Sequence, residues 1–494
     1  MKRIAKHIFK NAAAPLSLAG GALLLSACTI IGPNYEPPQT AAFEEPSFIN
    51  EAPYEETAPL STWWTAFDDT VLTGLVSAGV DQNRSLAAAY ANVNASRAQL
   101  GVARLNRLPF DTVTASYQDS RTASSVFAAS TGQGSDIGPF PTNDISDLNI
   151  SASWEIDLFG RVTRTINIAK ADLGQAQALL ADLQTVLIAD IVDAYVNVRG
   201  LEAQLAVAVN NAENQAETLR LTETIRDAGR GTDFDVERAK AQLSGTRASI
   251  PPLETAAAAA RYQLAVLTGQ TPAQIEASLT DAAPLPIIAG PLAIGDPASL
   301  LRRRPDIAVR ERALAAATEN IGLNLTNAFP RVNLVGAVGY QSIGFDDAFS
   351  ENALNFNVGP SITWSLTDLL RARDRVAAAD AGAQAAFAEY EQAILVALAE
   401  VETALVQQAN LQRQLTELTE AERASAAASR LARLRYENGA ADFLSVLDAE
   451  RRELEAADQL AAIRTATARA QVAMFRALRA GPAPRDGAEP AISE

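Results

Sequence analysis

The chain has 494 residues, with 41 Lys and Arg against 58 Asp and Glu, a formal net charge of −17, one histidine and one cysteine. This acidic balance argues against nucleic acid as a partner, because neutralising phosphates requires a basic face. With a single thiol, no disulfide within the chain can form, so packing must hold the fold together.

The N-terminus has the pattern of a secretory signal, predicted over residues 1–27. Four basic residues precede an apolar run, Ala12–Leu25, which is shorter than the roughly 20 residues that a membrane-spanning helix needs. Loss of this segment would also remove the only histidine, His7. Ser-His and Cys-His catalysis are then excluded, and we expect no zinc site and no metal or cofactor.

The single cysteine, Cys28, lies at the end of this signal. The tetrapeptide Leu25–Cys28 resembles a bacterial lipobox, which implies cleavage before Cys28 and the attachment there of a diacylglycerol and an N-acyl chain. A buried structural thiol fits this position poorly. Over residues 28–68, six prolines oppose regular helix and predict an extended segment that runs from the lipid anchor. These prolines are Pro33, Pro37, Pro38, Pro46, Pro53 and Pro59.

The rest of the chain is an internal duplication. The segment that begins at Ala152 aligns with the segment that begins at Ile362, and "AGRGTDFDVERA" aligns with "NGAADFLSVLDA" at the same offset. We predict a first repeat over 69–269, a linker over 270–295, a second repeat over 296–481 and a disordered tail over 482–494.

Each repeat starts with a helix and a strand hairpin, predicted over 110–158 and 331–365. Apolar residues occupy alternate positions from Leu148 to Leu158 and from Leu354 to Trp364, as strands require. About ten such residues are typical of an outer-membrane barrel strand, although a half-buried soluble sheet has the same pattern. In lipid, four strands would leave open edges that cost several kcal/mol per unpaired group, so other chains would have to complete the sheet.

Each repeat continues as a long helical hairpin, predicted over 161–268 and 367–480. Leu173, Leu180 and Leu187 follow a seven-residue spacing that is typical of a coiled coil. A helix from Arg161 to about Arg226 would be roughly 100 Å long. Gly229 and Gly439 predict the two turns, since glycine tolerates the left-handed conformation that ends a helix.

Several motifs together resemble those of the outer-membrane efflux lipoproteins, the TolC-like channels of tripartite exporters. The motifs are "WWTAFDD" (63–69), "WEIDLFGR" (154–161), "IPPLE" (250–254), "LLRRRPDIAVRE" (300–311) and "RYENGAADFLSVLDAER" (435–451). The resemblance implies an α+β membrane protein of the outer membrane, in which three chains form a twelve-stranded β-barrel continuous with a twelve-helix tunnel in the periplasm. It further implies a passive, gated exit duct for small compounds, with a periplasmic adaptor and an inner-membrane pump of the resistance-nodulation-division type as partners.

The resemblance also implies site residues. Asp235, Tyr436 and Asp448 match gate positions, where rings of like charges would repel one another. Asp235 lies three residues after Thr232 and could equally complete a helix capping box, whereas Asp448 lies deeper in its helix and favours a gate.

The turns themselves match the tips that contact the adaptor, at Gly229, Gly231 and Gly439. Ala441 and Ser445 stand where related channels carry a basic residue and a further Asp. We therefore expect a lock that is weaker or differently built.

Other charged residues allow alternatives. Glu155 and Asp157 would share one strand face at a glycosidase-like spacing, but lumen-side or interface groups are favoured because no cleft is indicated. For Arg302–Arg304, solvated or interhelical ion pairs are favoured over phosphate binding. Pro251 and Pro252 predict a kink or bulge. The remaining alternatives for the whole chain are a lipid-anchored coiled-coil tether, a type I secretion duct and, least supported, an enzyme.

Overall fold

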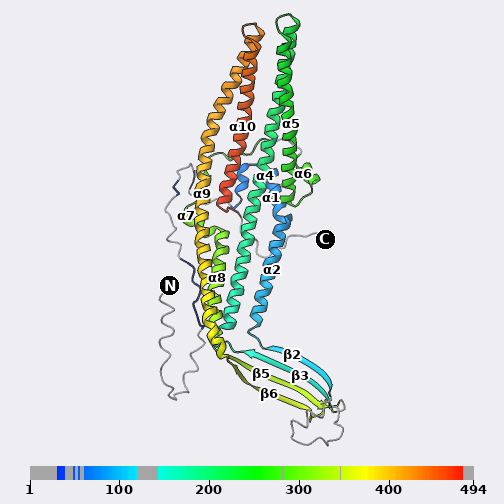
Figure 1. Ribbon diagram of the computed structural model, residues 1–494, viewed down its shortest axis with the longest axis vertical. Coiled ribbons are helices and arrows are strands. Elements are labelled where there is room, and N and C mark those ends of the chain that lie inside the picture. The colour runs from blue at the N-terminus through cyan, green and yellow to red at the C-terminus, as the bar shows by residue number, and fades with distance from the viewer. Residues whose placement is uncertain are drawn as a thin grey trace. The chain divides into compact units, whose positions relative to one another are not determined.

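The computed structural model describes residues 30–38, 48–49, 54–55, 61–120, 143–279, 283–344 and 347–481 (Figure 1). The predicted signal, Cys28 and the tail over 482–494 lie outside the described residues. The chain divides into two compact units. The first takes Met1–Glu36, Gln99–Lys170 and Ala315–Gln384, and the second takes Pro37–Ala98, Ala171–Leu314 and Ala385–Glu494. The units therefore cut across the two sequence repeats.

The first unit contains a four-stranded antiparallel sheet in the order β2-β3-β5-β6. Its strands are β2 (Phe110–Ser120), β3 (Asn143–Glu155), β5 (Arg331–Ile343) and β6 (Leu354–Thr363). Each repeat contributes one hairpin, and the hairpins join where β3 pairs with β5. Within the described residues, β2 and β6 each have one neighbour and so present an unpaired edge.

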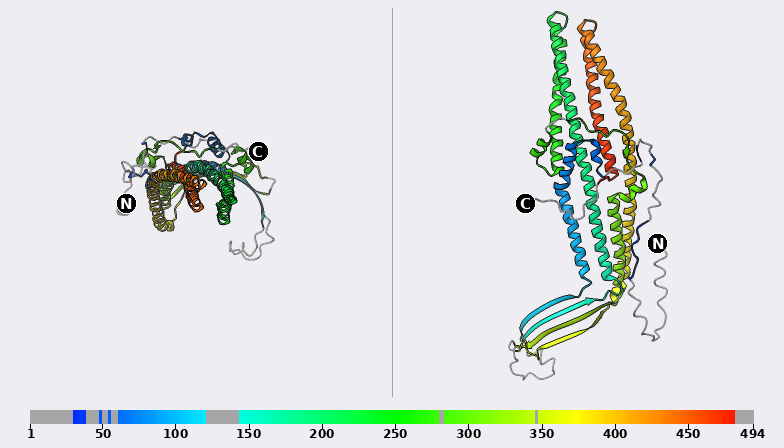
Figure 2. Two further views of the ribbon diagram at one scale, coloured as in Figure 1. Left: turned by 90° about the horizontal axis from the view of Figure 1, so that it is seen from above. Right: turned by 180° about the vertical axis from the view of Figure 1, so that it is seen from behind.

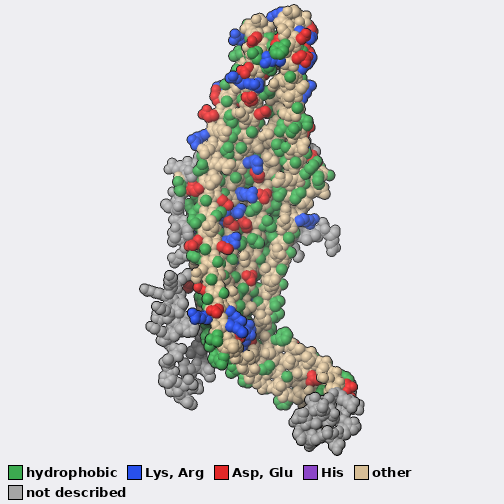
Figure 3. Space-filling view, in the orientation of Figure 1, with side chains coloured by type: hydrophobic (Ala, Val, Ile, Leu, Met, Phe, Trp, Pro, Cys, Tyr) green, Lys and Arg blue, Asp and Glu red, His purple; other side chains and the backbone are tan. Residues whose placement is uncertain are grey.

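The register aligns the alternating apolar residues into one face of this sheet. Val113 pairs with Ile150, Ile150 with Val338, and Val338 with Phe356, so one apolar row crosses all four strands. Most of these side chains are exposed in the single chain. The opposite face carries polar rows such as Thr114, Asn149 and Asn355. In the view of Figure 3, few ionised side chains lie over the strands.

The second unit contains most of two helical hairpins (Figures 1 and 2). Helices α4 (Arg161–Asp227) and α5 (Asp233–Thr268) form the first, and α9 (Leu366–Glu437) and α10 (Phe443–Ala477) form the second. α5 continues without a break through Pro251 and Pro252, where a kink or bulge was predicted. Within the described residues, no helix is both long enough and apolar enough to cross a membrane.

The shorter elements either precede β2 or lie between α5 and β5 in sequence. They are β1 (Tyr54–Glu55), η1 (Trp63–Phe67), α1 (Thr70–Gln82), α2 (Arg84–Leu105), α6 (Pro272–Ser278), β4 (Leu292–Ala293), α7 (Pro297–Arg303) and α8 (Pro305–Thr326). The segment predicted to be extended over 28–68 thus contains a short helical turn, η1. The predicted linker contains α6, whose capping box at Thr271 starts a helix locally.

The core of the second unit explains the "WWTAFDD" motif. Trp63 is buried and stacks on Phe475 of α10, with ring centroids 4.6 Å apart. Its indole nitrogen donates to the carbonyl of Ala480 at 3.0 Å. Asp69 caps α1 and also accepts a hydrogen bond from Tyr195 of α4 at 2.6 Å. The motif therefore joins the segment just before the first repeat, through Trp63, to the end of the second repeat.

Candidate functional site

The two hairpin turns have the same local geometry. Gly229 and Gly439 adopt the left-handed conformation, with φ of 76° and 73°. Arg230 donates its backbone N–H to the carbonyl of Ile225 at 3.0 Å, and Ala440 donates to that of Arg435 at 2.7 Å. These bonds close the Schellman-type ending that glycine favours. The turns thus lie where the sequence predicted them.

The turns also approach each other. A Cβ placed on Gly439 would lie 2.7 Å from Nη2 of Arg230, so the arginine of the first turn reaches the backbone of the second. Gly231, the third predicted tip residue, lies beside Arg230 and is half-buried. The tips of the two hairpins therefore form one surface in the second unit.

Asp235 completes a capping box at the start of α5. Its backbone N–H donates to Oγ1 of Thr232 at 3.2 Å, and its carboxylate accepts from the backbone N–H of Thr232 at 3.3 Å. Thr232 Oγ1 and the carboxylate thus satisfy N–H groups that the helix itself leaves unpaired. This is the capping alternative left open by the sequence, and the gate assignment of Asp235 stays a prediction.

Tyr436 lies in the core of the hairpin tips. Its ring packs beside Phe443, with centroids 5.8 Å apart, in a cluster with Ala239 and Val446. Burial raises the pKa of the Tyr436 hydroxyl, the Asp235 carboxylate acts in the same direction, and Thr222 opposes them. Tyr436 thus joins α9 to both α10 and α5.

Asp448 is half-exposed on α10. Its carboxylate pairs with Nε of Arg452 at 3.1 Å and with Arg451 at 3.7 Å, both in its own helix. Such exposed pairs along one helix contribute only tenths of a kcal/mol. A gate at Asp448 would therefore have its charge partly balanced from its own helix, and the assignment stays a prediction.

The structure adds a buried carboxylate, Glu450, that the sequence reasoning missed. It accepts a hydrogen bond from Thr218 of α4 at 2.5 Å and another from Arg433 of α9 at 2.9 Å. Burial raises the pKa of Glu450, and the two donors partly oppose this rise. One side chain of α10 thus joins α4 of the first hairpin to α9 of the second.

A signal for Glu450 was present in the spacing of buried residues. Phe443, Val446 and Glu450 occupy the i, i+3 and i+7 positions of one helix face, and all three are buried. On α4, Gln215, Thr218 and Thr222 form a matching buried polar row. We call these three residues with Arg433 and Glu450 the polar seam. The helical spacing from Phe443 indicates that Glu450 is buried, but it does not indicate which residues bind its carboxylate.

Glu155 and Asp157 do not share a strand face, so that prediction is wrong. β3 ends at Glu155, because Asp157 accepts from the backbone N–H of Val162 at 3.0 Å and of Thr163 at 2.8 Å and thereby caps α4. Glu155 instead pairs with Arg161. The two acids therefore stabilise the transition from β3 to α4, Asp157 by capping the helix and Glu155 by pairing with Arg161.

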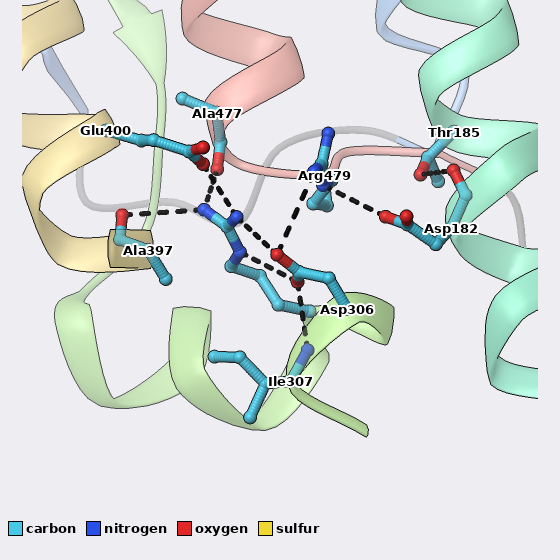
Figure 4. Close-up of polar contacts among 9 residues, drawn as sticks. Asp182, Thr185, Asp306, Ile307, Ala397, Glu400, Ala477 and Arg479 are labelled. Atoms are coloured by element: carbon cyan, nitrogen blue, oxygen red, sulfur yellow. Dashed lines mark hydrogen bonds and ion pairs between the residues drawn. The ribbon is translucent and has the colours of Figure 1, made fainter. Parts of the chain in front are cut away.

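Arg304 confirms the interhelical alternative for the arginine run. Its guanidinium is fully buried and donates to both oxygens of Asp306, at 3.0 and 2.6 Å, and to Glu400 of α9 at 2.7 Å (Figure 4). It also donates to the carbonyl of Ala477, at the end of α10, at 2.7 Å. Arg302 and Arg303 are exposed.

Asp306 has a second cation in this network. Arg479 pairs with Asp182 of α4 at 3.0 Å and lies 3.8 Å from Asp306. Burial alone would raise the pKa of Asp306, but the hydrogen bonds and charge of Arg304 outweigh it and lower that pKa. The network holds α4, α8, α9 and the end of α10 together in the second unit.

A family model described as outer membrane efflux protein matches residues 75–270 and 297–479. The chain belongs to the outer membrane efflux protein family. The two matched segments coincide closely with the two repeats. The family consists of passive outer-membrane channels, so this chain is an efflux channel of the outer membrane and not an enzyme.

Two curated relatives match this efflux protein over nearly its whole length. Nodulation protein T of Rhizobium leguminosarum bv. viciae is 31% identical over 96% of this chain and 94% of its own. Outer membrane protein OprJ of Pseudomonas aeruginosa is 29% identical over 93% of this chain and 94% of its own.

Solved structures agree with the fold. The outer-membrane channel OprN is 38% identical, with a TM-score of 0.84 over 92% of this chain and all of its own. The open state of the MtrE outer membrane channel of Neisseria gonorrhoeae is 25% identical, with a TM-score of 0.80 over 92% of this chain and 99% of its own. The efflux protein therefore shares the α+β fold of these channels.

Proposed function

We propose that this efflux protein is a homotrimeric, lipid-anchored exit duct that serves a periplasmic adaptor and an inner-membrane pump of the resistance-nodulation-division type. Three copies of the sheet would close a twelve-stranded barrel in the outer membrane, and three copies of the two helical hairpins would form the tunnel. The observation that carries this proposal is the apolar face that the register builds across all four strands.

The sheet supports closure by other copies of the chain. β2 and β6 present unpaired edges, and lipid offers no water to satisfy them. Pairing β6 of one protomer with β2 of the next would remove every edge and leave the apolar face toward lipid. Barrels of this kind alternate apolar and polar positions along each strand, as these strands do.

The hairpin tips support a gate. Three candidate gate residues lie close in sequence to the turn glycines Gly229 and Gly439: Asp235 at the start of α5, Tyr436 at the end of α9 and Asp448 in α10. The polar seam adds Glu450, two residues further along α10. Since Ala441 removes one basic partner seen in related channels, contacts within the chain through Arg433 and Glu450 take a larger share of the lock. The exposed tips would contact the adaptor.

The cargo class is that of small compounds. Relatives over most of this chain include a toluene efflux pump outer membrane protein and pyoverdine export outer membrane proteins, both from Pseudomonas. These names favour pump-driven export of small molecules over the type I secretion duct and over a structural tether.

Single-channel conductance of the purified protein in planar bilayers tests this function. We expect a small, cation-selective conductance that rises several-fold in Asp448→Ala or Asp235→Ala, because each substitution would remove a carboxylate from the contacts that hold the tips of the closed gate together. Glu420→Ala, an exposed carboxylate of α9, is the matched control and should leave the conductance unchanged.

The outcomes separate the parts of the proposal. Conductance without any effect of Asp448→Ala or Asp235→Ala would retain the duct and reject the acidic gate. Well-folded trimers that do not conduct would reject the duct in favour of the tether.

A further inference from the structure

The first unit contains a buried arginine that the duct itself does not explain. Arg164, in the first turn of α4, is fully buried. Its Nη1 donates to Glu319 of α8 at 2.6 Å. Its Nη2 lies 3.1 Å from each of three oxygens, which are the carbonyls of Ile31 and Gly32 and the side-chain oxygen of Asn34. The segment Ile30–Asn34 follows shortly after Cys28, and we call it the strap.

Glycines shape the place where the strap lies. Gly32 has φ of 96°, and a Cβ on it would lie 2.8 Å from the Cα of Gly322 in α8. A Cβ on Gly322 would lie 2.5 Å from Nε of Arg164, and one on Gly160 would lie 3.0 Å from Ile30. Residues 160 and 322 thus leave the space that the strap and the arginine fill.

The chemistry of this site requires a planar, many-donor cation. The strap offers neutral carbonyl and amide oxygens only, and Glu319 balances the charge of Arg164. An arginine fork can donate to the strap and to the acid at once, whereas lysine presents one compact charge. The strap N–H of Ile31 also donates to the carbonyl of Phe159 at 3.3 Å.

We propose that Arg164 is the positioning residue of the lipid anchor. This inference rests on the proposed lipidation of Cys28. Cys28 lies two residues before Ile30, so a docked strap limits it to roughly 7 Å from that residue, and therefore to the start of α4 just after β3 ends. Without docking, the next described residue with a buried side chain is Phe48, and twenty residues of chain could reach roughly 70 Å.

The consequence is that the distance between the lipid anchor and the start of α4 is fixed. With the strap docked, the acyl chains enter the membrane beside the helix-side end of the sheet, where Trp154 stands. A released strap would let the same lipid sit at any distance from the sheet that the loose chain allows.

A spin label two residues beyond the strap tests this in the full-length protein. With Cys28 acylated, a cysteine at Glu36→Cys is the only free thiol, and a nitroxide there reports whether the strap is held. We expect an immobilised spectrum in the parent protein and at least a several-fold gain in the mobile fraction for Arg164→Met and Arg164→Lys. Arg310→Gln, which breaks an exposed ion pair with Glu389 on α8 and α9, is the control and should stay immobilised.

Gly32→Val keeps this test decisive if Arg164 variants misfold. It leaves the Arg164–Glu319 pair in place and blocks docking by steric overlap, so we expect the same mobile fraction. An immobilised label in either Arg164→Lys or Gly32→Val would overturn the proposal, since Arg164 would then serve helix packing alone. Mass spectrometry of the N-terminal peptide reports acylation separately: an unmodified Cys28 would overturn the anchor, even with the strap docked.

Discussion

Some buried ionisable side chains in the second unit lie where several helices meet and have partners on other helices. Arg304 and Glu450 are the two clearest cases. A buried charge that loses its partner raises the free energy of the folded protein. These residues therefore oppose movement of the helices away from one another, although the net attraction within each ion pair is small. Substitution of each residue should therefore change the measured stability of the protein or its dependence on pH.

Arg304→Met should destabilise the protein by about 1 to 3 kcal/mol, because the half-buried Asp306, the exposed Glu400 and the Ala477 carbonyl lose their shared donor, while Arg479 stays near Asp306. Denaturant unfolding of the detergent-solubilised protein measures this free energy. Arg302→Met is the matched control at an exposed position two residues away, and we expect a change within about 0.5 kcal/mol. Equal effects of the two substitutions would contradict the role of the network.

Glu450 should make the polar seam sensitive to pH. Its pKa is raised above the usual 4.5, so the packed seam binds a proton more readily than the separated helices do. The resulting stabilisation is complete below pH 4.5 and is lost as pH rises through the raised pKa. Arg433 and, in the opposite sense, Glu453 are the charges that act on this group.

Thermal unfolding of the protein from pH 4 to pH 8 checks this sign. Glu450→Gln should reduce the fall in the unfolding midpoint with rising pH over that window, while other half-buried carboxylates with raised pKa values, such as Asp182 and Asp190, keep their share. Glu455→Gln, an exposed carboxylate of the same helix, should retain the full fall. A slope that is the same in Glu450→Gln and the parent protein would assign the pH dependence elsewhere.

At the scale of elements, strands and hairpins were predictable where one repeating pattern decides the structure. The alternation from Leu148 predicted the apolar face of the sheet, and Gly229 and Gly439 predicted both turns. Element ends were not predictable in the same way. Leu158 continues the alternation, yet β3 stops at Glu155 because the Asp157 carboxylate caps α4 instead.

In the candidate site, too, features set by a local sequence pattern were predictable, and contacts between distant segments were not. Asp235 was recognisable as a cap from its spacing to Thr232, but its gate assignment depends on other chains and stays a prediction. Glu450 could be placed on a buried face from its spacing, whereas its bonds to Thr218 and Arg433 join helices far apart in sequence. Contacts of that kind have no local pattern that one sequence reveals.

The turn glycines should be hard to replace. Gly439→Ala places a Cβ in a left-handed residue 2.7 Å from Arg230, and we expect a loss of roughly 1 to 2 kcal/mol in the free energy of unfolding. Gly245→Ala, within α5 and with open space around its Cβ, should instead gain roughly 0.5 to 1 kcal/mol. Denaturant unfolding compares the two, and a stabilising Gly439→Ala would refute the geometry of the turn.

Two tryptophans should report the membrane face of the sheet. Trp154 and Trp364 are substantially exposed at the helix-side end of the strands, while Trp63 and Trp64 are buried in the second unit. Brominated lipids should quench part of the fluorescence of the reconstituted protein, since tryptophan favours membrane interfaces. The quenched part should disappear in a Trp154→Phe and Trp364→Phe double variant. Unchanged quenching there would place the bilayer elsewhere.

At the scale of the whole molecule, duplication and assembly depend on one another. Each repeat alone has two strands, which are marginal in water and cannot close in lipid. Two repeats in one chain give four strands and still leave two edges. The proposed trimer satisfies the strands that the chain itself leaves open, so the functional unit is larger than the folded chain.

The β3–β5 pairing has a further consequence for how such a ring can evolve. Inside the chain, the second strand of one repeat hairpin pairs with the first strand of the next. In the proposed trimer, β6 of one protomer meets β2 of its neighbour in that same relation. The β3–β5 pairing within one chain and the proposed β6–β2 pairing between protomers are therefore equivalent. The proposed ring thus has pseudo-sixfold symmetry. A half-length ancestor carrying one hairpin of each kind could have closed the same ring as a hexamer, and gene fusion would then have freed the two halves to diverge.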